Sequence, residues 1–496
     1  MTTDAADDGP RSRWTRSRLG FWAGLIAFAA LLAIPETPGF AAETRATAAI
    51  AALMALWWMT EALPLPATAL LPLALLPAFG VLSPAAAAAP YANPVIFLFF
   101  GGFVLALAMQ RWLLHRRIAL GVVAAAGTSP RRLVGGFMVA TAFLSMWISN
   151  TATAAMMLPI GIALIELLRP PDLPVGRFAF GTALMLGIAY AATIGGVGTL
   201  IGTPPNAVFA AAARELLGCE VSFVEWMRVG IPIVLVLLPI TWALLVFVLF
   251  PPGPLGDGAA ALLREQRAGL GPMRQAEGLT LAVFAGAALA WLFREPKALG
   301  AITIPGLAGW WPGIDDSTVA IAAALLLFLL PARGFRGERI MDWDTATRLP
   351  WGVLLLFGGG LSLAAAFEAS GLTRVIAELV AGAGGLPPVV LILAMTALFI
   401  YLSELASNTA IAAMAMPLVA AVAIGLGQPP IVWMAVAAIA ASTAFMLPVG
   451  TPPNAIAFGT GYITMGQMIR AGFWLNLVAL VLDTIVALLL APGLIR

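Results

Sequence analysis

The chain has 496 residues, of which 61% are apolar and 10% are charged, and its formal net charge is +2. Water-soluble domains carry about 25% charged residues, so this composition excludes a soluble globular fold. The positive surplus is too small to coat a nucleic acid, which excludes nucleic-acid binding. At about 20 apolar residues for each bilayer crossing, the length allows about a dozen crossings. We therefore predict an all-α polytopic protein of the cell (inner) membrane.

Few side chains are suited to metal or nucleophilic chemistry. Cys219 and His115 are the one cysteine and the one histidine of the chain, too few for a zinc site. His115 lies among arginines, in the sequence RWLLHRR, and is expected at a solvated or interfacial position. We therefore expect the chain not to be an enzyme, with no catalytic residues.

Apolar segments follow one another along most of the chain. They lie near residues 20–37, 47–60, 67–82, 93–110, 133–167, 178–213, 229–250, 279–293, 318–331, 351–370, 386–427, 430–459 and 471–492. The longest carry Gly, Pro or Ser-Asn breaks in the middle. We read 133–167 and 386–427 as re-entrant helical hairpins and 178–213 and 430–459 as long helices broken halfway. About eleven through-going transmembrane helices remain.

The distribution of basic residues gives an orientation. With the N-terminus in the cytoplasm, this span count places nineteen of the 26 basic residues on the inner side and seven outside. The C-terminus is then expected outside. The predicted parts are a cytoplasmic N-terminus with the first transmembrane helix (1–46), a first repeat (47–250), a cytoplasmic linker (251–278) and a second repeat (279–496).

Three sequence elements occur twice in the same order. FFGGFVLALAM is similar to FGGGLSLAAAF, SNTATAAMMLPI to SNTAIAAMAMPL, and GTPPNAVF to GTPPNAIAF. The Ser-Asn-Thr motifs begin at Ser149 and Ser407, and the GTPPN motifs at Gly202 and Gly450. The chain is therefore an internal duplication. Crossing counts give the halves opposite orientations, the inverted-repeat plan of secondary transporters.

The repeated motifs carry polar groups into apolar segments. Each Ser-Asn-Thr motif has a second serine four residues earlier, Ser145 or Ser403, which helical spacing would place on the same face. In each GTPPN motif, glycine lets the chain leave the helix, threonine is a favoured N-cap, and proline suits the first helical position. Polar groups at membrane depth must be buried in protein or line a wet cavity. The two Ser-Asn-Thr motifs are expected to face each other near mid-membrane.

Four helix N-termini are expected at the centre: the second arm of each hairpin and the second half of each broken helix. At about +0.5 charge each they sum to about +2, which matches a dianion. No arginine or lysine lies within the motif elements, so amides, hydroxyls and dipoles would recognise the anion. Free carbonyls with Ser and Asn oxygens suit a small hard cation such as Na+.

The motif pairs resemble the divalent anion:sodium symporter family, over nearly the whole chain including WWMTEALPLPATALLP (Trp57 to Pro72). The resemblance implies eleven spans in an inverted repeat, a homodimer, and a scaffold part with a moving transport part that works as an elevator. It also implies transport of di- or tricarboxylates, or of sulfate in some branches, usually with Na+.

The resemblance also implies the site residues. One Na+ site would be formed by Ser145, Ser149, Asn150 and Gly202. The pseudo-symmetric Na+ site would be formed by Ser403, Ala406, Ser407, Asn408, Gly450 and Pro452. The substrate carboxylates would meet Asn150, Thr151, Asn408 and Thr409, with Thr203, Pro204, Thr451 and Pro452 nearby. Gly450 stands where relatives can have alanine.

Several functions remain open at this point. The leading one is Na+-coupled import of dicarboxylates such as succinate, malate, fumarate or citrate. A Na+-independent dicarboxylate exchanger and a carrier of sulfate or another inorganic oxyanion are alternatives. A Na+/H+ antiporter on a similar plan would need an essential mid-membrane carboxylate, for which Glu404 is the first candidate.

Overall fold

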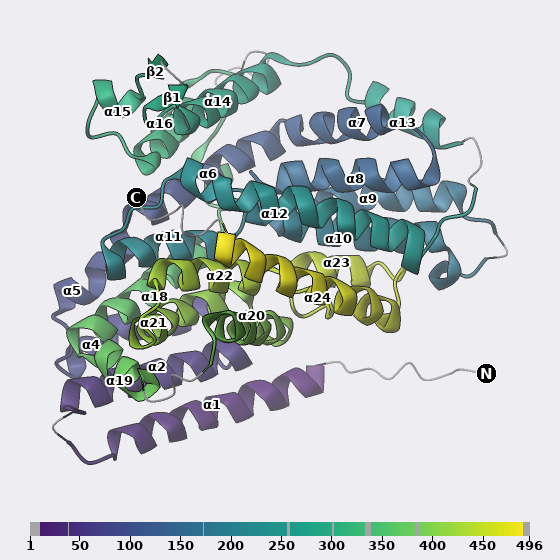
Figure 1. Cartoon of the computed structure of the whole chain (residues 1–496). Helices are drawn as coiled ribbons and strands as arrows, with labels where there is room; N and C mark the ends of the chain where they lie inside the picture. The colour runs from purple at the N-terminus through teal and green to yellow at the C-terminus, as the bar shows by residue number, and fades with distance from the viewer. Residues whose placement is uncertain are drawn as a thin grey trace.

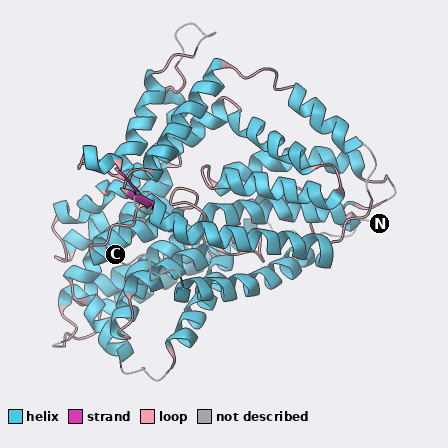
Figure 2. Cartoon of the chain, turned by 45° about the horizontal axis from the view of Figure 1, so that its top comes forward, coloured by secondary structure: helices cyan, strands magenta, loops and turns pink. Residues whose placement is uncertain are grey.

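A computed structural model describes residues 10–37, 39–171, 173–254, 258–299, 302–332, 339–381 and 386–489. The predicted all-helical class is confirmed, with one small exception, an antiparallel pair of strands, β1 (Lys297–Leu299) and β2 (Ile302–Ile304) (Figure 2). In the described part of the chain, nine helices are long and apolar enough to cross a membrane. The predicted cytoplasmic start, residues 1–9, and the predicted outer end, residues 490–496, lie outside the described residues.

The elements of the first half are α1 (Pro10–Leu32), α2 (Ala42–Thr60), α3 (Leu65–Thr68), α4 (Leu71–Ala78), α5 (Pro84–Ala88), η1 (Ala89–Ala92), α6 (Pro94–Arg111), α7 (Leu114–Ala126), α8 (Pro130–Ser145), α9 (Asn150–Leu168), η2 (Val175–Arg177), α10 (Ala179–Val197), α11 (Pro204–Leu217), α12 (Phe223–Ala243) and η3 (Leu244–Leu249). Those of the second half are α13 (Gly258–Ala268), α14 (Gln275–Leu292), α15 (Leu307–Trp310), α16 (Asp316–Leu329), α17 (Trp343–Ala346), α18 (Trp351–Ala369), α19 (Leu372–Ala381), α20 (Pro388–Leu405), α21 (Asn408–Gly425), α22 (Pro430–Ser442), α23 (Pro452–Gly459) and α24 (Met465–Leu489).

The Ser-Asn-Thr motifs lie between paired helices, α8 with α9 and α20 with α21. The first pair is joined by residues 146–149 and the second by 406–407. Ser145 is the last residue of α8, whereas Ser149 is the N-cap of α9. Ser403 likewise lies in α20, two residues before its end, and Ser407 is the N-cap of α21. The expectation that both serines of a motif share one helix face is therefore wrong, because the helix ends between them.

The GTPPN motifs lie where a helix ends and another begins. The chain leaves α10 at Val197 and starts α11 at Pro204; it leaves α22 at Ser442 and starts α23 at Pro452. Thr203 and Thr451 have nearly identical extended backbones, with φ and ψ of −141° and 144° and of −140° and 144°. Neither hydroxyl caps its helix, so the expectation of threonine side-chain caps is wrong.

The two copies of the duplication interlock through the short helices that follow the breaks. Helix α11, from the first copy, packs on α21 and α22 of the second. Helix α23, from the second copy, packs on α9 and α10 of the first (Figure 1). Each short helix thus lies against the hairpin arm and the broken helix of the other copy. This exchange places the motif regions of the two halves in one packed body.

Helices α10 and α22 form the centre of that body. The apolar window of α10 is entirely buried, and α22 is buried at every position from Ile431 to Ser442. Helix α1 instead lies at the edge and packs along α2 (Figure 1). A Cβ atom at Gly20 would lie 1.9 Å from Thr60 Oγ1, so glycine permits that close approach.

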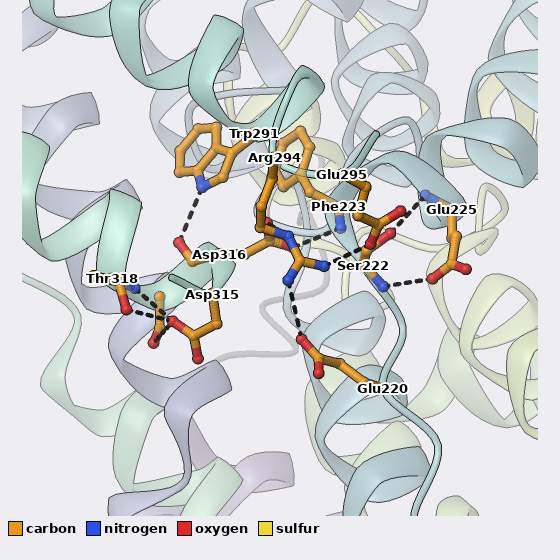
Figure 3. Close-up of polar contacts among 11 residues, drawn as sticks. Glu220, Ser222, Phe223, Glu225, Trp291, Arg294, Glu295, Asp315, Asp316 and Thr318 are labelled. Carbon is orange, nitrogen blue, oxygen red and sulfur yellow. Dashed lines mark hydrogen bonds and ion pairs between the residues drawn. The ribbon is translucent and has the colours of Figure 1, made fainter. Parts of the chain in front are cut away.

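A polar cluster away from the repeated motifs joins the start of α12, the segment after α14 and the start of α16 (Figure 3). Arg294, 8% exposed, pairs with Asp316 at 2.9 Å, Glu295 at 2.7 Å and Glu220 at 3.4 Å. The other Asp316 oxygen accepts a hydrogen bond from Phe223 N at 2.7 Å. A buried charge is stable only with such partners. The cluster therefore fixes the start of α12 to the neighbouring helices and does not include the motif residues.

Candidate functional site

The first motif pair brings oxygen atoms from three helices together. Ser145 Oγ lies 2.8 Å from the amide oxygen of Asn150 and 2.6 Å from the carbonyl oxygen of Ala192. The same end of the Asn150 amide lies 3.1 Å from Ala192 O and 3.2 Å from Gly202 O. One hydroxyl hydrogen serves only one of these oxygens. The group therefore needs either a turned amide, which donates its N–H, or a cation, which binds all four oxygens.

Of the residues predicted for this site, Ser145, Asn150 and Gly202 are brought together. Ser149 lies at the turn, where its hydroxyl accepts a hydrogen bond from Ala152 N at 3.3 Å. The carbonyl of Ala192 was not predicted, because a backbone oxygen in the middle of an apolar helix leaves no sign in the sequence. The oxygen atoms present fit a small cation such as Na+, which prefers carbonyl, amide and hydroxyl oxygens.

Two glycines of α10 make this arrangement possible. A Cβ atom at Gly196 would lie 2.4 Å from Asn150 Oδ1, and one at Gly195 would lie 2.2 Å from Ala142 O. A Cβ atom at Gly202 would lie 2.4 Å from Gly196 O. Any side chain here would push the hairpin away from α10. The Gly-Gly pair at 195–196 is the sequence signal for this close approach.

The break after α10 is fastened to the first hairpin. Asn206 Nδ2 donates hydrogen bonds to Thr199 O at 2.7 Å and Gly196 O at 3.0 Å. Thr199 Oγ1 donates to Met146 O in the hairpin turn. The asparagine that ends the GTPPN motif therefore donates to backbone carbonyls that have no helical N–H partner where α10 is broken. Its own Oδ1 atom is buried without a hydrogen-bond partner among the described residues.

The second motif pair contains buried oxygens that lack partners. Within the described ranges, Ser403 Oγ, Asn408 Oδ1 and Thr451 Oγ1 are buried and have no hydrogen-bond partner. Gly450 lies beside Ser403, since a Cβ atom there would be 3.3 Å from Ser403 O. Unpartnered buried oxygens are costly unless something binds them. This donor set also fits a small cation.

The other residues predicted for the second site lie around the hairpin turn. Ala406 is buried and extended, with φ −145° and ψ 171°, and Ser407 is the N-cap of α21 without a side-chain capping bond. Pro452 starts α23 and is exposed.

The predicted substrate residues stand at the first turns of four helices. Asn150, Pro204, Asn408 and Pro452 are the first residues of α9, α11, α21 and α23. Thr151 is exposed and Thr409 half-buried, whereas Thr203 and Thr451 are buried. Unpaired N–H groups and the positive ends of the dipoles are therefore available at each motif for an anion.

Glu404 holds the segment that follows α22. Its Oε1 accepts hydrogen bonds from Phe445 N and Met446 N, both at 2.7 Å, and from Asn476 Nδ2 at 2.8 Å. Its Oε2 accepts from Leu447 N at 2.8 Å. Four donors therefore occupy the acceptor positions of this carboxylate. A Cβ atom at Gly450 would lie 2.9 Å from Glu404 Oε2, so alanine would press on this carboxylate.

One basic residue reaches the second hairpin from far away in the sequence. Arg16 Nη2 donates to Leu405 O at 2.6 Å and to Met59 O at 2.6 Å. These carbonyls lie in the last turns of α20 and α2, where a cation is favoured by the helix dipole. No cation lies inside the motif elements, but this one stands beside the second hairpin turn. Sequence analysis missed it because the partner is a backbone atom about four hundred residues away.

A family model described as the sodium:sulfate symporter transmembrane region matches residues 16–495. The chain belongs to this sodium:sulfate symporter family. Among its relatives is a sodium-dependent dicarboxylate transporter SdcS of Staphylococcus saprophyticus, 44% identical over 453 residues, 90% of this chain and 85% of that protein. SdcS of Staphylococcus aureus is 42% identical over 454 residues, again 90% and 85% of the two chains.

Two solved structures share the fold of this symporter. The YdaH transporter of Alcanivorax borkumensis matches with a TM-score of 0.57 at 18% identity, over 82% of this chain and 87% of that one. MtrF of Neisseria gonorrhoeae, titled as one of a class of antimetabolite efflux pumps, matches with a TM-score of 0.56 at 15% identity, over 96% and 94%. The chain is a multi-pass membrane transporter and not an enzyme, as predicted.

Proposed function

We propose that this symporter imports dicarboxylates, such as succinate, malate or fumarate, together with Na+. The relatives named sodium-dependent dicarboxylate transporters, at 42–44% identity over most of the chain, support the substrate and the coupled ion. The observation that carries the proposal is the duplicated donor set: two groups of oxygens without cationic partners, each beside helix N-termini. An anion and cations bound side by side would stabilise each other.

The first Na+ would be held by Ser145 Oγ, Asn150 Oδ1, Gly202 O and Ala192 O, with Ser149 at the turn. The distances among these oxygens, 2.6–3.2 Å, support this assignment, since oxygens that share a small cation lie about 3 Å apart. Neutral ligands alone bind a cation weakly, which suits an ion that must be released on the other side.

The second Na+ would be held around Ser403, Asn408 and Gly450, with Ala406, Ser407 and Pro452 next to them. The unpartnered oxygens of Ser403 and Asn408 support this assignment. Glu404 would not ligate the ion: its four hydrogen bonds hold Phe445 to Leu447 in place, so that the loop can present Gly450.

The dicarboxylate would lie between the two motif pairs. Its carboxylates would meet the side chains of Asn150 and Thr151 at one end and of Asn408 and Thr409 at the other. The first turns at Thr203, Pro204, Thr451 and Pro452 would line the space. Hydrogen bonds from amides and hydroxyls together with helix dipoles would replace the fixed positive charges of many anion sites.

The test is uptake of radiolabelled succinate by purified protein in liposomes. Uptake should require an inward Na+ gradient, and unlabelled malate or fumarate should compete for it. Uptake that ignores Na+ and instead needs internal succinate would replace symport with exchange. Competition by sulfate, without competition by dicarboxylates, would make the protein an inorganic-oxyanion carrier.

A Na+/H+ antiporter is the remaining alternative, and Glu404 argues against it. An antiporter needs a carboxylate that gains and loses a proton, whereas Glu404 is saturated by four hydrogen-bond donors. Proton flux driven by Na+ in liposomes without any dicarboxylate would instead support a Na+/H+ antiporter.

The remaining architectural expectations also belong to this proposal. They are eleven spans, an inverted repeat with the two motif tips face to face near mid-membrane, the four parts at 1–46, 47–250, 251–278 and 279–496, elevator movement, a homodimer, a cytoplasmic N-terminus and an outer C-terminus. The crossed packing of α11 and α23 on the opposite copies supports the repeat.

Cys219, a native exposed thiol, is expected outside, so an impermeant maleimide should label it in intact cells. Cys219→Ser is the control, and mass measurement in mild detergent tests the homodimer.

A further inference from the structure

Asp483 is a buried carboxyl group that the proposed sites do not use. It lies on α24 and none of its surface is exposed. Its Oδ2 atom has one hydrogen-bond contact, with Thr443 Oγ1 at 3.3 Å. Its Oδ1 atom has no hydrogen-bond partner in the part of the chain that the structure describes. An ionised carboxylate here would have lost its water in exchange for a single hydroxyl donor.

Glu404 shows how this protein surrounds another buried carboxyl group with hydrogen-bond donors. That side chain receives four hydrogen bonds at 2.7–2.8 Å, three of them from backbone N–H groups. Asp483 has one long contact from a hydroxyl. The two carboxyl groups are thus placed in opposite surroundings, one as an acceptor of hydrogen bonds and the other with almost no donors.

The hydroxyl of Thr443 has other uses for its hydrogen. Its Oγ1 atom also lies 3.2 Å from both Ile439 O and Ala440 O, which are carbonyls of α22. If the hydroxyl donates to one of these carbonyls, its lone pairs face Asp483 and need a donor. A proton on the Asp483 carboxyl supplies that donor and completes both hydrogen bonds.

No basic side chain offsets a charge on Asp483. Among the described residues, the ionisable groups on the elements that contact α24 are Glu225 and Arg228 of α12, Tyr401 and Glu404 of α20, and Tyr190 of α10, whose hydroxyl donates to Met468 O; α22 has none. Arg470, on α24 itself, is exposed and about 20 Å away along the helix. No ion pair in the described ranges includes Asp483.

We propose that Asp483 is a proton-binding site, and that its neutral carboxyl donates a hydrogen bond to Thr443 Oγ1. Two turns earlier on α24, Asn476 contacts both Phe445 N at 3.2 Å and Glu404. Helix α24 therefore holds the 443–447 segment at two points, and this segment leads to Gly450 and Thr451. Loss of the proton leaves a buried charge with the Thr443 hydroxyl as its one donor, so that hydroxyl must turn away from the α22 carbonyls, which disturbs the segment that leads to the second motif pair.

The first test is thermal unfolding of the purified protein between neutral and alkaline pH. Asp483→Asn keeps the size of the side chain and supplies an amide N–H donor that does not ionise. Because the folded state favours the neutral acid, wild-type stability should fall as pH rises through its titration, whereas Asp483→Asn should escape that loss. Identical pH profiles for the two proteins would overturn the proposal. Glu368→Gln, at an exposed carboxyl, is the control and should keep the wild-type profile.

The second test rests on the proposed transport function and uses succinate uptake in the same pH range, where succinate is a full dianion. Wild-type uptake should decline at alkaline pH, and the decline should be lost in Asp483→Asn. A higher half-saturating Na+ concentration in Asp483→Asn, with an unchanged pH profile, would instead make Asp483 a sodium ligand and overturn the proposal. If no succinate moves in any variant, the transport function fails while the unfolding test still decides on the proton.

Discussion

The rings of Tyr190 and Phe445 meet edge to face, with centroids 5.3 Å apart and planes at 73°. Tyr190 stands two residues before Ala192, whose carbonyl lies beside Ser145 in the first motif pair. Phe445 N donates to Glu404, which lies next to Ser403 of the second motif pair. This buried contact directly joins α10 of the first copy to the segment after α22 of the second. A shift of α10 at the first motif pair would therefore press on the segment that leads to the second motif pair.

Replacing either motif asparagine should abolish coupled transport. Asn150→Ala removes an amide that lies within 3.2 Å of three oxygens, and Asn408→Ala removes a buried oxygen without a protein partner. Both side chains stand at helix starts and are half-buried, so the fold should survive. Succinate uptake should fall at least about tenfold, equivalent to about 1.4 kcal/mol.

Size-exclusion profiles of the two asparagine variants should match that of the wild type. Asn206→Ala offers a contrast, because that amide bonds three backbone carbonyls and its loss should lower the unfolding temperature. Wild-type uptake by Asn150→Ala or Asn408→Ala would contradict the site assignment.

Gly196→Ala should disturb the oxygens around Asn150 by steric overlap, without removing any of them. The new methyl group would lie 2.4 Å from Asn150 Oδ1, so the asparagine must leave its position. Overpacking of this kind costs about 1–3 kcal/mol. We expect a raised half-saturating Na+ concentration in uptake assays. Gly121→Ala is the matched control, since a Cβ atom there would meet nothing within 4 Å, and equal effects of both substitutions would refute the explanation.

Much of this arrangement could be predicted from sequence because the duplication marks it. Motif repetition locates the helix starts at Asn150, Asn408, Pro204 and Pro452, and proline and glycine explain the breaks. Tertiary partners could not be predicted. The carbonyl of Ala192 and the backbone donors to Glu404 are main-chain atoms, which every residue has. The threonine caps were mispredicted because Thr203 takes the capping backbone without turning its hydroxyl to the helix.

Glu404→Gln should weaken transport without converting the protein to another function. The glutamine NH2 group would face backbone N–H groups that now donate to a carboxylate, so at least one hydrogen bond is lost. Hydrogen bonds to charged groups contribute about 1.5–3 kcal/mol. The 445–447 segment should shift, lowering the unfolding temperature and raising the Na+ requirement. Glu368→Gln, at an exposed carboxyl, should leave both at wild-type values. An unchanged unfolding temperature in Glu404→Gln would show that the carboxylate does not hold the loop.

Arg16→Gln should affect the second motif pair from a distance. The guanidinium joins carbonyls in the last turns of α2 and α20, and α20 ends one residue before Ala406. A glutamine is shorter and uncharged, so both hydrogen bonds and the charge at the helix ends are lost. Because Arg16 is exposed, we expect a stability loss of about 1 kcal/mol or less. The effect on transport should be a changed half-saturating Na+ concentration, measured by succinate uptake at varied Na+. Arg267→Gln, an exposed arginine of α13 away from the hairpins, is the control. If both variants have the wild-type Na+ dependence, the contact between α1 and the second hairpin does not influence the site.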